Sequence, residues 1–201
     1  MGISWMIEES TKKNIVAIIP ARGGSQRLKR KNIHTIWGKP MIYWPIKAAQ
    51  DSNLIDDVWV TTEDPEIAEI AKSFGAKVHK RDPKLSEPHV YKMKAIRAAA
   101  KHIESTGIKP EIYISLQANS PEITSRTLDD AINDFRRYDR NELISVDCNW
   151  MQNAAFRIMK NWYVYQRDLS TKCGVYMCDL LDVHTIKDIK ELEERGEPST
   201  R

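Results

Sequence analysis

One loop near the start of the chain combines glycines with a dense group of cations. It runs from Pro20 to Asn32 and contains Gly23-Gly24-Ser25, whose backbone can curl until successive N–H groups face one anion. Five positive charges fall within ten residues here, at Arg22, Arg27, Lys29, Arg30 and Lys31. Backbone donors beside cations suit a polyphosphate. The loop therefore predicts a phosphate site, with a solvated basic face and a basic targeting patch as the two alternatives.

Several well-known catalytic patterns are missing from the sequence. Gly-Lys-Ser/Thr does not follow the glycines, and Gly-x-Gly-x-x-Gly is absent, so neither a Walker A loop nor a dinucleotide fingerprint is present. Ser25 and Ser120 lack a Gly-x-Ser-x-Gly elbow, which argues against a hydrolase. No cysteine pair has Cys-x-x-Cys spacing, so we expect reduced thiols at Cys148, Cys173 and Cys178.

Composition limits the class of protein further. The 201 residues carry a net charge of +3, with 41% hydrophobic and 29% charged residues, which is typical of one globular domain and excludes a disordered chain or a coiled-coil rod. The small net charge argues against a general nucleic-acid binder. The longest apolar stretch near the N-terminus is far below the ~20 residues of a membrane span. Residues 1–14 lack the apolar core of a signal peptide, so we expect a cytoplasmic protein that does not bind membranes.

Strand and helix patterns alternate along the chain. Short apolar runs predict strands at 15–19, 58–60, 76–79, 112–116 and 143–146. Helical spacing and capping residues predict helices from Pro40 to Ala49, after Asp64-Pro65-Glu66, over 90–103, after Thr124 and over 186–195. After Cys148 we expect short extended pieces at 154–159, 162–165 and 175–177. This order predicts an α/β fold with three α/β/α layers and a mostly parallel sheet. The single domain covers 15–195, with tails at 1–14 and 196–201.

Three loops with unusual chemistry follow predicted strands. They cover 20–32, 81–88 and 117–121. In open α/β sheets ligands bind beyond the carboxyl ends of the strands, so we expect these loops to meet at one site.

The motifs in these loops resemble a known family. Ile19-Pro20-Ala21-Arg22-Gly23-Gly24-Ser25, followed by Arg27-Leu28 and Lys31-Asn32-Ile33, is similar to the signature of the acylneuraminate cytidylyltransferase (CMP-sialic acid synthetase) family. Relatives of that family act on legionaminic, pseudaminic and 3-deoxy-octulosonic acids. Later landmarks occur in the same order, at 60–64, 81–87, 116–121, 174–177 and 182–189. The resemblance covers about residues 14–195 and implies a Rossmann-like nucleotidyltransferase fold.

The resemblance also implies a reaction and a set of roles. CMP would pass from the substrate CTP to the anomeric hydroxyl of an acidic 2-keto-3-deoxy sugar, with release of pyrophosphate, in a pathway of carbohydrate biosynthesis. Arg22 and Lys31 would act on the triphosphate as catalytic residues. The implied nucleotide-binding residues are Ala21, Arg22, Gly23, Gly24, Ser25, Asn32, Arg81 and Ser86. Those implied for the sugar are Gln117, Asn119 and Ser120. Asp182 and His184 match the metal positions, for Mg²⁺ or, because histidine is softer, Mn²⁺.

Departures from the family pattern leave a second hypothesis open. Gln26 replaces a basic residue, His184 replaces an acid, and the segments 146–174 and 176–182 are shorter than in the family. These differences also fit a nucleotide-binding homologue that has lost its chemistry. A third hypothesis is an RNA-binding protein that uses the basic loop. A homodimer remains open, but the segment that forms it in the family is shorter here.

Overall fold

A seven-stranded sheet forms the centre of the protein. The computed structural model describes residues 14–168 and 170–198. The strands lie in the order β5-β4-β1-β6-β8-β7-β9, and β8 alone among them runs antiparallel to its neighbours. Their bounds are β1 Asn14–Pro20, β4 Asp57–Thr62, β5 Lys77–Lys80, β6 Pro110–Leu116, β7 Glu142–Val146, β8 Gln152–Lys160 and β9 Cys173–Met177. The mostly parallel sheet predicted from the apolar runs is therefore confirmed.

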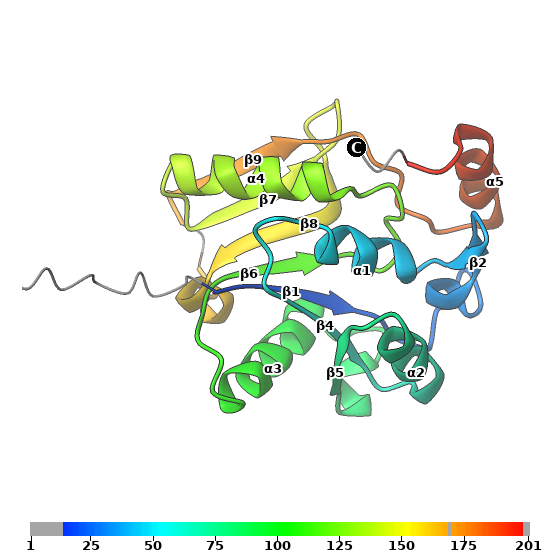
Figure 1. Cartoon of the computed structure of the whole chain (residues 1–201), viewed down its shortest axis with the longest axis horizontal. Coiled ribbons are helices and arrows are strands. Elements are labelled where there is room, and N and C mark those ends of the chain that lie inside the picture. Colours follow the sequence, from blue (N-terminus) through cyan, green and yellow to red (C-terminus); the bar gives the residue numbers. More distant parts are fainter. Residues whose placement is uncertain (1–13, 169, 199–201) are drawn as a thin grey trace, which may run out of the picture.

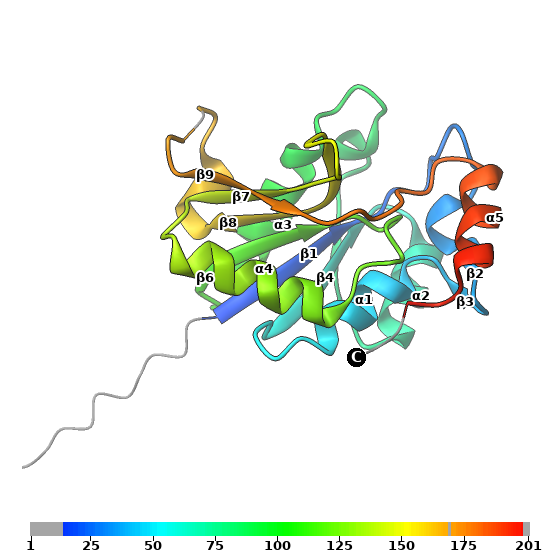
Figure 2. The same ribbon diagram turned by 90° about the horizontal axis from the view of Figure 1, so that it is seen from above.

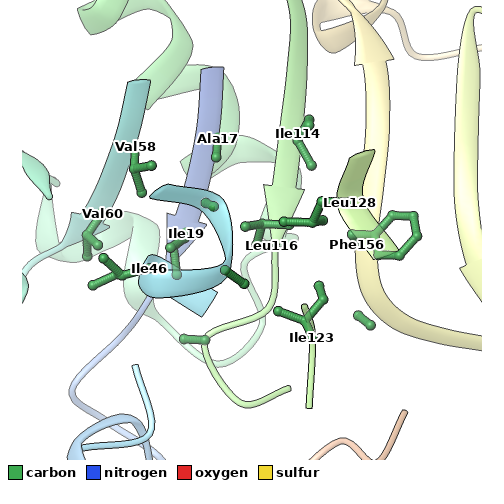
Figure 3. Packing of buried hydrophobic residues seen from close by; sticks show 14 of the residues in the cluster. Ala17, Ile19, Ile46, Val58, Val60, Ile114, Leu116, Ile123, Leu128 and Phe156 are labelled. Carbon is green, nitrogen blue, oxygen red and sulfur yellow. The ribbon is translucent and has the colours of Figure 1, made fainter. Parts of the chain in front are cut away.

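Helices cover both faces of this sheet (Figure 1). The helices are α1 Tyr43–Gln50, α2 Pro65–Ser73, α3 Lys92–Ser105, α4 Ser125–Arg137 and α5 Ile186–Arg195. Alternate residues of β1 point to opposite faces, as a strand requires. Ile15, Ala17 and Ile19 join the core under α1, α2 and α4, part of which is shown in Figure 3. Val16 and Ile18 join the core under α3. The three-layer α/β/α prediction is confirmed.

The helix starts follow from the capping residues. The side chain of Asp64 accepts hydrogen bonds from the backbone N–H groups of Glu66 and Ile67 at 2.9 and 3.1 Å. Thr124 caps α4 through the N–H of Thr127. At α5, Thr185 and Asp188 form a capping box. Each cap satisfies donors that the first helical turn leaves free.

A third, smaller core brings the end of the chain to its beginning. A hairpin of β2 (Thr35–Ile36) and β3 (Lys39–Pro40) lies beside α5, beyond the carboxyl ends of β1 and β6 (Figure 2). The residues that fill this core are Leu28, Ile36, Met41, Trp44, Val183, Ile189 and Leu192. Its packing fixes residues 182–184 next to the loop that follows β1.

The structure also corrects several expectations. The helix expected from Pro40 begins at Tyr43, because Pro40 pairs with Thr35 in the hairpin. Residues 162–165, expected to be extended, lie in a 3-10 helix, η3 (Asn161–Tyr165), whose Tyr163 and Val164 are buried in the core under α3. Asn14, assigned to the tail, opens β1. The rest of that tail, 1–13, and residues 199–201 lie outside the described residues. None of the helices described could cross a membrane.

Candidate active site

The three loops meet around one cavity at the carboxyl end of the sheet. Its volume is about 300 Å³. The lining residues are Pro20, Arg22, Ser25, Arg27, Lys31, Asn32, Arg81, Leu85, Ser86, Glu87, Pro88, Val90, Lys92, Ala95, Gln117, Asn119 and His184. Five of these side chains are cations and one, Glu87, is an acid. The cavity therefore offers a strongly positive environment to an anionic ligand.

Glu63, directly after β4, connects two of the loops. One carboxylate oxygen accepts the backbone N–H of Gly23 at 2.8 Å. The other accepts Arg81 Nη2 at 2.6 Å and the Ser86 hydroxyl at 2.5 Å. Burial raises the pKa of Glu63, but these hydrogen bonds outweigh it and hold the pKa below its usual range. The glycine loop and the 81–86 loop are thus held in register by one carboxylate.

Arg81 is the most deeply buried cation in the cavity. Its side chain is 4% exposed, and its Nη2 atom pairs with Glu63. Its Nε atom is buried and has no hydrogen-bond partner among the described residues. A buried donor without a partner costs free energy, unless a ligand supplies the acceptor. The Arg81 Nε–H is therefore a donor in the cavity wall that no described residue satisfies.

A second set of contacts ties the first loop to the segment before α5. Asn32 donates from Nδ2 to the carbonyl of Arg22 at 2.9 Å. Lys31 Nζ and Asn119 Nδ2 both donate to the carbonyl of Val183, at 3.1 and 2.9 Å. Residues far apart in the sequence thereby form one wall of the cavity.

Asp182 lies behind this wall with a hydroxyl and two ammonium groups around it. Its carboxylate accepts a hydrogen bond from Ser120. Burial raises the pKa of Asp182, while Ser120, Lys92 and Lys31 act in the opposite direction. Burial lowers the pKa of Lys31 to about 8; Asp182 opposes this shift, and Arg27 and Arg22 add to it. An anion bound near Lys31 would restore its proton affinity.

Most of the side chains predicted for the site line the cavity. They are Arg22, Ser25, Lys31, Asn32, Arg81, Ser86, Gln117, Asn119 and His184. The others lie next to it. Ala21 is fully buried, and its N–H bonds to Thr61 of β4. The Gly23 N–H donates to Glu63. A Cβ atom added at Gly24 would meet no atom within 4 Å. Ser120 is buried and donates a hydrogen bond to Asp182.

Two residues of the site were not predicted from the sequence. Glu63 belongs to the family landmark at 60–64, but the sequence alone assigns it no role of its own. An acid directly after a parallel strand is a signal that could have identified it as a site residue. Lys92, the first residue of α3, gave no such signal, because a lysine at a helix start resembles any solvated residue.

The described residues do not form a complete metal cage. They contain no group of three or more His, Cys, Asp or Glu side chains that could hold an ion. Asp182 offers one carboxylate and His184 a nitrogen, which Mg²⁺ does not prefer. Mg²⁺ is commonly held by one or two carboxylates together with substrate phosphates. Asp182 fits that arrangement as a single protein ligand, and His184 does not.

A mostly parallel α/β sheet with a cationic cavity beyond its strand ends is the arrangement in which α/β folds of this class bind nucleotides. A family model described as Cytidylyltransferase matches residues 16–168. The chain belongs to this cytidylyltransferase family.

Individual relatives agree with this assignment. N-acylneuraminate cytidylyltransferase A of Danio rerio is 36% identical over 145 residues, which are 72% of this chain and 33% of that protein. Pseudaminic acid cytidylyltransferase of Campylobacter jejuni is 32% identical over 158 residues, 78% of this chain and 68% of that protein. The chain thus spans about a third of the length of the fish relative.

Solved structures share the fold. A CMP:2-keto-3-deoxy-manno-octonic acid synthetase, solved with CTP, superimposes with a TM-score of 0.73 at 17% identity, covering 91% of this chain and 98% of that one. A cytidylyltransferase from Leptospira borgpetersenii gives a TM-score of 0.71 at 19% identity, covering 90% of this chain and 85% of that one. These similarities establish the Rossmann-like nucleotidyltransferase fold.

Proposed function

We propose that the protein transfers CMP from CTP to the anomeric hydroxyl of an acidic 2-keto-3-deoxy sugar. The hydroxyl oxygen forms a bond to the α-phosphorus. The bond from that phosphorus to the oxygen shared with the β-phosphate breaks, pyrophosphate leaves, and the hydroxyl loses its proton. The observation that carries the proposal is the meeting of Arg22, Lys31 and Arg81 with Gln117 in one cavity. This arrangement favours an active enzyme over a homologue that only binds nucleotide.

The triphosphate occupies the side of the cavity lined by the first loop. Arg22 and Lys31 hold the charge that develops as pyrophosphate leaves, and Arg27 adds to the positive field. Preorganised donors of this kind act without reorganisation during the reaction, which is why their removal is costly. The backbone N–H of Gly24 completes the cradle, whereas those of Gly23 and Ser25 already bond to Glu63 and to the Gly23 carbonyl.

The nucleoside lies over the 81–86 loop. Arg81, held by Glu63, presents its unpartnered Nε–H to the nucleoside. Ser86 and Asn32 frame the same side of the cavity. Buried polar donors discriminate well between ligands, because the wrong ligand leaves them unpaired.

The acceptor faces Gln117 and Asn119, with Ser120 behind them. The relatives described above are named for N-acylneuraminate and pseudaminic acid, which supports an acidic sugar as the acceptor class. Asp182 would ligate Mg²⁺ that arrives with the phosphates of CTP. That ion would supply further neutralisation of phosphate charge. The protein contributes orientation and charge to the reaction.

Nucleotide-dependent thermal stabilisation gives the first test. The purified protein is melted with CTP, ATP, GTP or UTP, each with and without Mg²⁺ or Mn²⁺. A ligand at a hundredfold excess over Kd stabilises the native state by about 2.7 kcal/mol. We expect a CTP-selective shift. Pyrophosphate release is then measured with CTP and N-acetylneuraminic, pseudaminic or 3-deoxy-octulosonic acid.

Each outcome bears on a different part of the proposal. Turnover with one of the acids supports the transferase. A CTP shift without turnover on any acid supports the nucleotide-binding homologue instead. The absence of any nucleotide shift would remove the phosphate role of the first loop and the proposed function with it.

A further inference from the structure

We propose that Lys92 binds the carboxylate of the acidic acceptor and so selects acids over neutral sugars. This inference rests on the proposed function and adds a specificity-determining residue to it. Lys92 opens α3 and lines the cavity. It lies outside every motif that suggested the family.

The Lys92 ammonium has no direct partner in the part of the chain that the structure describes. It forms no hydrogen bond and no ion pair there, in contrast to two other cavity cations. Lys31 donates to Val183, and Arg81 pairs with Glu63. The Lys92 side chain is exposed to the solvent of the cavity, which it lines. A cation that lines a cavity and has no direct partner there can bind an anion that arrives from outside.

The two lysines of the cavity, Lys31 and Lys92, differ in the charged groups with which they interact. Lys31 interacts electrostatically with Asp182 and also with Arg22 and Arg27 of the phosphate loop. Lys92 interacts with the same Asp182, but its other charged neighbour is Arg157. Asp182 therefore interacts with two ammonium groups, and of the two only Lys92 also interacts with Arg157.

Arg157 lies on the strand next to the residues proposed for the acceptor. Arg157 belongs to β8 and pairs in register with Ser115 of β6, two residues before Gln117. The backbone N–H of Gln117 donates to Ala155 of the same β8 at 2.9 Å. Lys92 and Gln117, the residue proposed to face the sugar, thus line the same cavity, and Lys92 interacts with a cation of the strand that pairs beside Gln117.

Arg157 is less suited to hold the acceptor's carboxylate. Its Nε atom is already paired with Glu142, which is buried. The phosphates, for their part, have Arg22, Arg27 and Lys31 on their own side. The carboxylate of a sugar acid, adjacent to the anomeric carbon, would bring its charge to Lys92 while the anomeric hydroxyl faces the α-phosphate.

A pair of lysines on one helix allows a matched experiment. Lys92→Met removes the ammonium and keeps an aliphatic side chain. Lys94→Met makes the same change two residues later, at a position that is exposed like Lys92 but does not line the cavity. Lys92→Arg restores a cation. Steady-state rates are measured with the turned-over sugar acid and with its methyl ester, and CTP binding is measured by calorimetry without acceptor.

For Lys92→Met we expect the KM for the acid to rise roughly 10- to 100-fold, as for the loss of a hydrogen bond to a charged group. The preference for acid over methyl ester should fall by a similar factor. The affinity of Lys92→Met for CTP should stay within about threefold of wild type. Lys94→Met should match wild type in every measurement. Lys92→Arg should recover part of the preference for the acid. A merely structural role would not alter the acid-to-ester ratio.

Three results would overturn the assignment. Equal acid-to-ester ratios in Lys92→Met and wild type would leave Lys92 without a role in acceptor choice. A loss of CTP affinity as large as the loss for the acid would assign Lys92 to the phosphates. Wild-type protein that binds CTP but turns over none of the three acids would refute the proposed function itself, independently of the two variants.

Discussion

The backbone N–H of Gly23 points at the Glu63 carboxylate, 2.8 Å away, and not into the cavity. A glycine loop that looks like a phosphate cradle in the sequence thus uses one of its own donors to fix its position. The same carboxylate binds Arg81 and Ser86 from the opposite loop. Glu63 is a positioning residue: it sets the distance between the groups proposed for the triphosphate and those proposed for the nucleoside.

Glu63→Gln should therefore weaken nucleotide binding without removing a group that touches it. The amide keeps the size of the side chain but has only one acceptor oxygen, so its N–H₂ group faces at least one of the three donors in either orientation. A hydrogen bond to a charged group contributes about 1.5–3 kcal/mol, so we expect a roughly tenfold or larger rise in the Kd for CTP. Calorimetric titration with CTP measures it.

Glu69→Gln is the control for this change. Glu69 lies in an exposed ion pair with Lys72 on α2, and such pairs contribute little. The Kd of the Glu69→Gln variant for CTP should equal that of wild type. If Glu63→Gln also bound CTP like wild type, the two loops would not depend on Glu63 for their positions.

The cations of the first loop can be tested individually. Arg22 lines the cavity, whereas Lys29 is exposed and does not. Arg22→Ala should lower kcat/KM for CTP by about 10²–10³, the effect of removing one preorganised donor. Lys29→Ala should remain within about twofold. Initial rates of pyrophosphate release provide the comparison, and an Arg22→Ala enzyme of full activity would disprove the phosphate role of Arg22.

The adjacent glycines give a sharper test of the loop's shape. A Cβ atom added at Gly23 would lie 2.2 Å from Asp64 Oδ2 and 3.0 Å from Asp64 Cβ. Asp64 cannot easily move away, because it caps α2 and pairs with Arg30. A Cβ atom added at Gly24 meets nothing within 4 Å. We expect Gly23→Ala to lower kcat/KM at least tenfold and the melting temperature as well.

Gly24→Ala keeps the backbone N–H and should resemble wild type in both measurements. A loss in Gly23→Ala but not in Gly24→Ala would show that only Gly23 is needed for the close approach of Asp64, a difference that the Gly-Gly pair in the sequence does not reveal. Equal losses in the two variants would mean that loop flexibility, and not the close approach of Asp64 to Gly23, explains the pair.

Much of the fold followed from the sequence, because local signals and packing agree. The apolar run at 15–19 could be satisfied only by burial on both faces, and Asp64-Pro65 could hardly be anything but a helix start. The expectation failed where tertiary pairing decided. Pro40 suits the first turn of a helix, yet its pairing with Thr35 in the hairpin postpones α1 to Tyr43.

The site was predictable to the extent that loop position and charge determine it. Sequence order alone brought Arg22, Arg81 and Gln117 to one edge of the sheet, as the cavity now shows. Sequence order could not predict the contacts that depend on the direction in which a side chain points. Ser120 turns inward to Asp182, and Lys92 reaches the cavity from a helix start that carries no motif.

A histidine pair outside the cavity predicts how stability changes with pH. His79 of β5 shares a 2.9 Å hydrogen bond with Thr61 and lies 4.9 Å, centroid to centroid, from the ring of His102 on α3. Burial, His102 and Arg81 together lower the pKa of His79 to about 4. The unfolded chain takes up this proton near pH 6.5, its ordinary value, and the folded chain only near pH 4.

Between these two pH values the unfolded state binds more protons, so the free energy of unfolding must fall as the pH falls. The loss from one such group approaches about 1.4 kcal/mol per pH unit within that window. Urea unfolding at pH 7.5, 6.0 and 5.0 measures it. His79→Gln, which cannot take up the proton, should flatten the pH dependence, whereas His89→Gln, at an exposed position, should not. A wild-type pH dependence that survives unchanged in His79→Gln would assign the acid sensitivity to other groups.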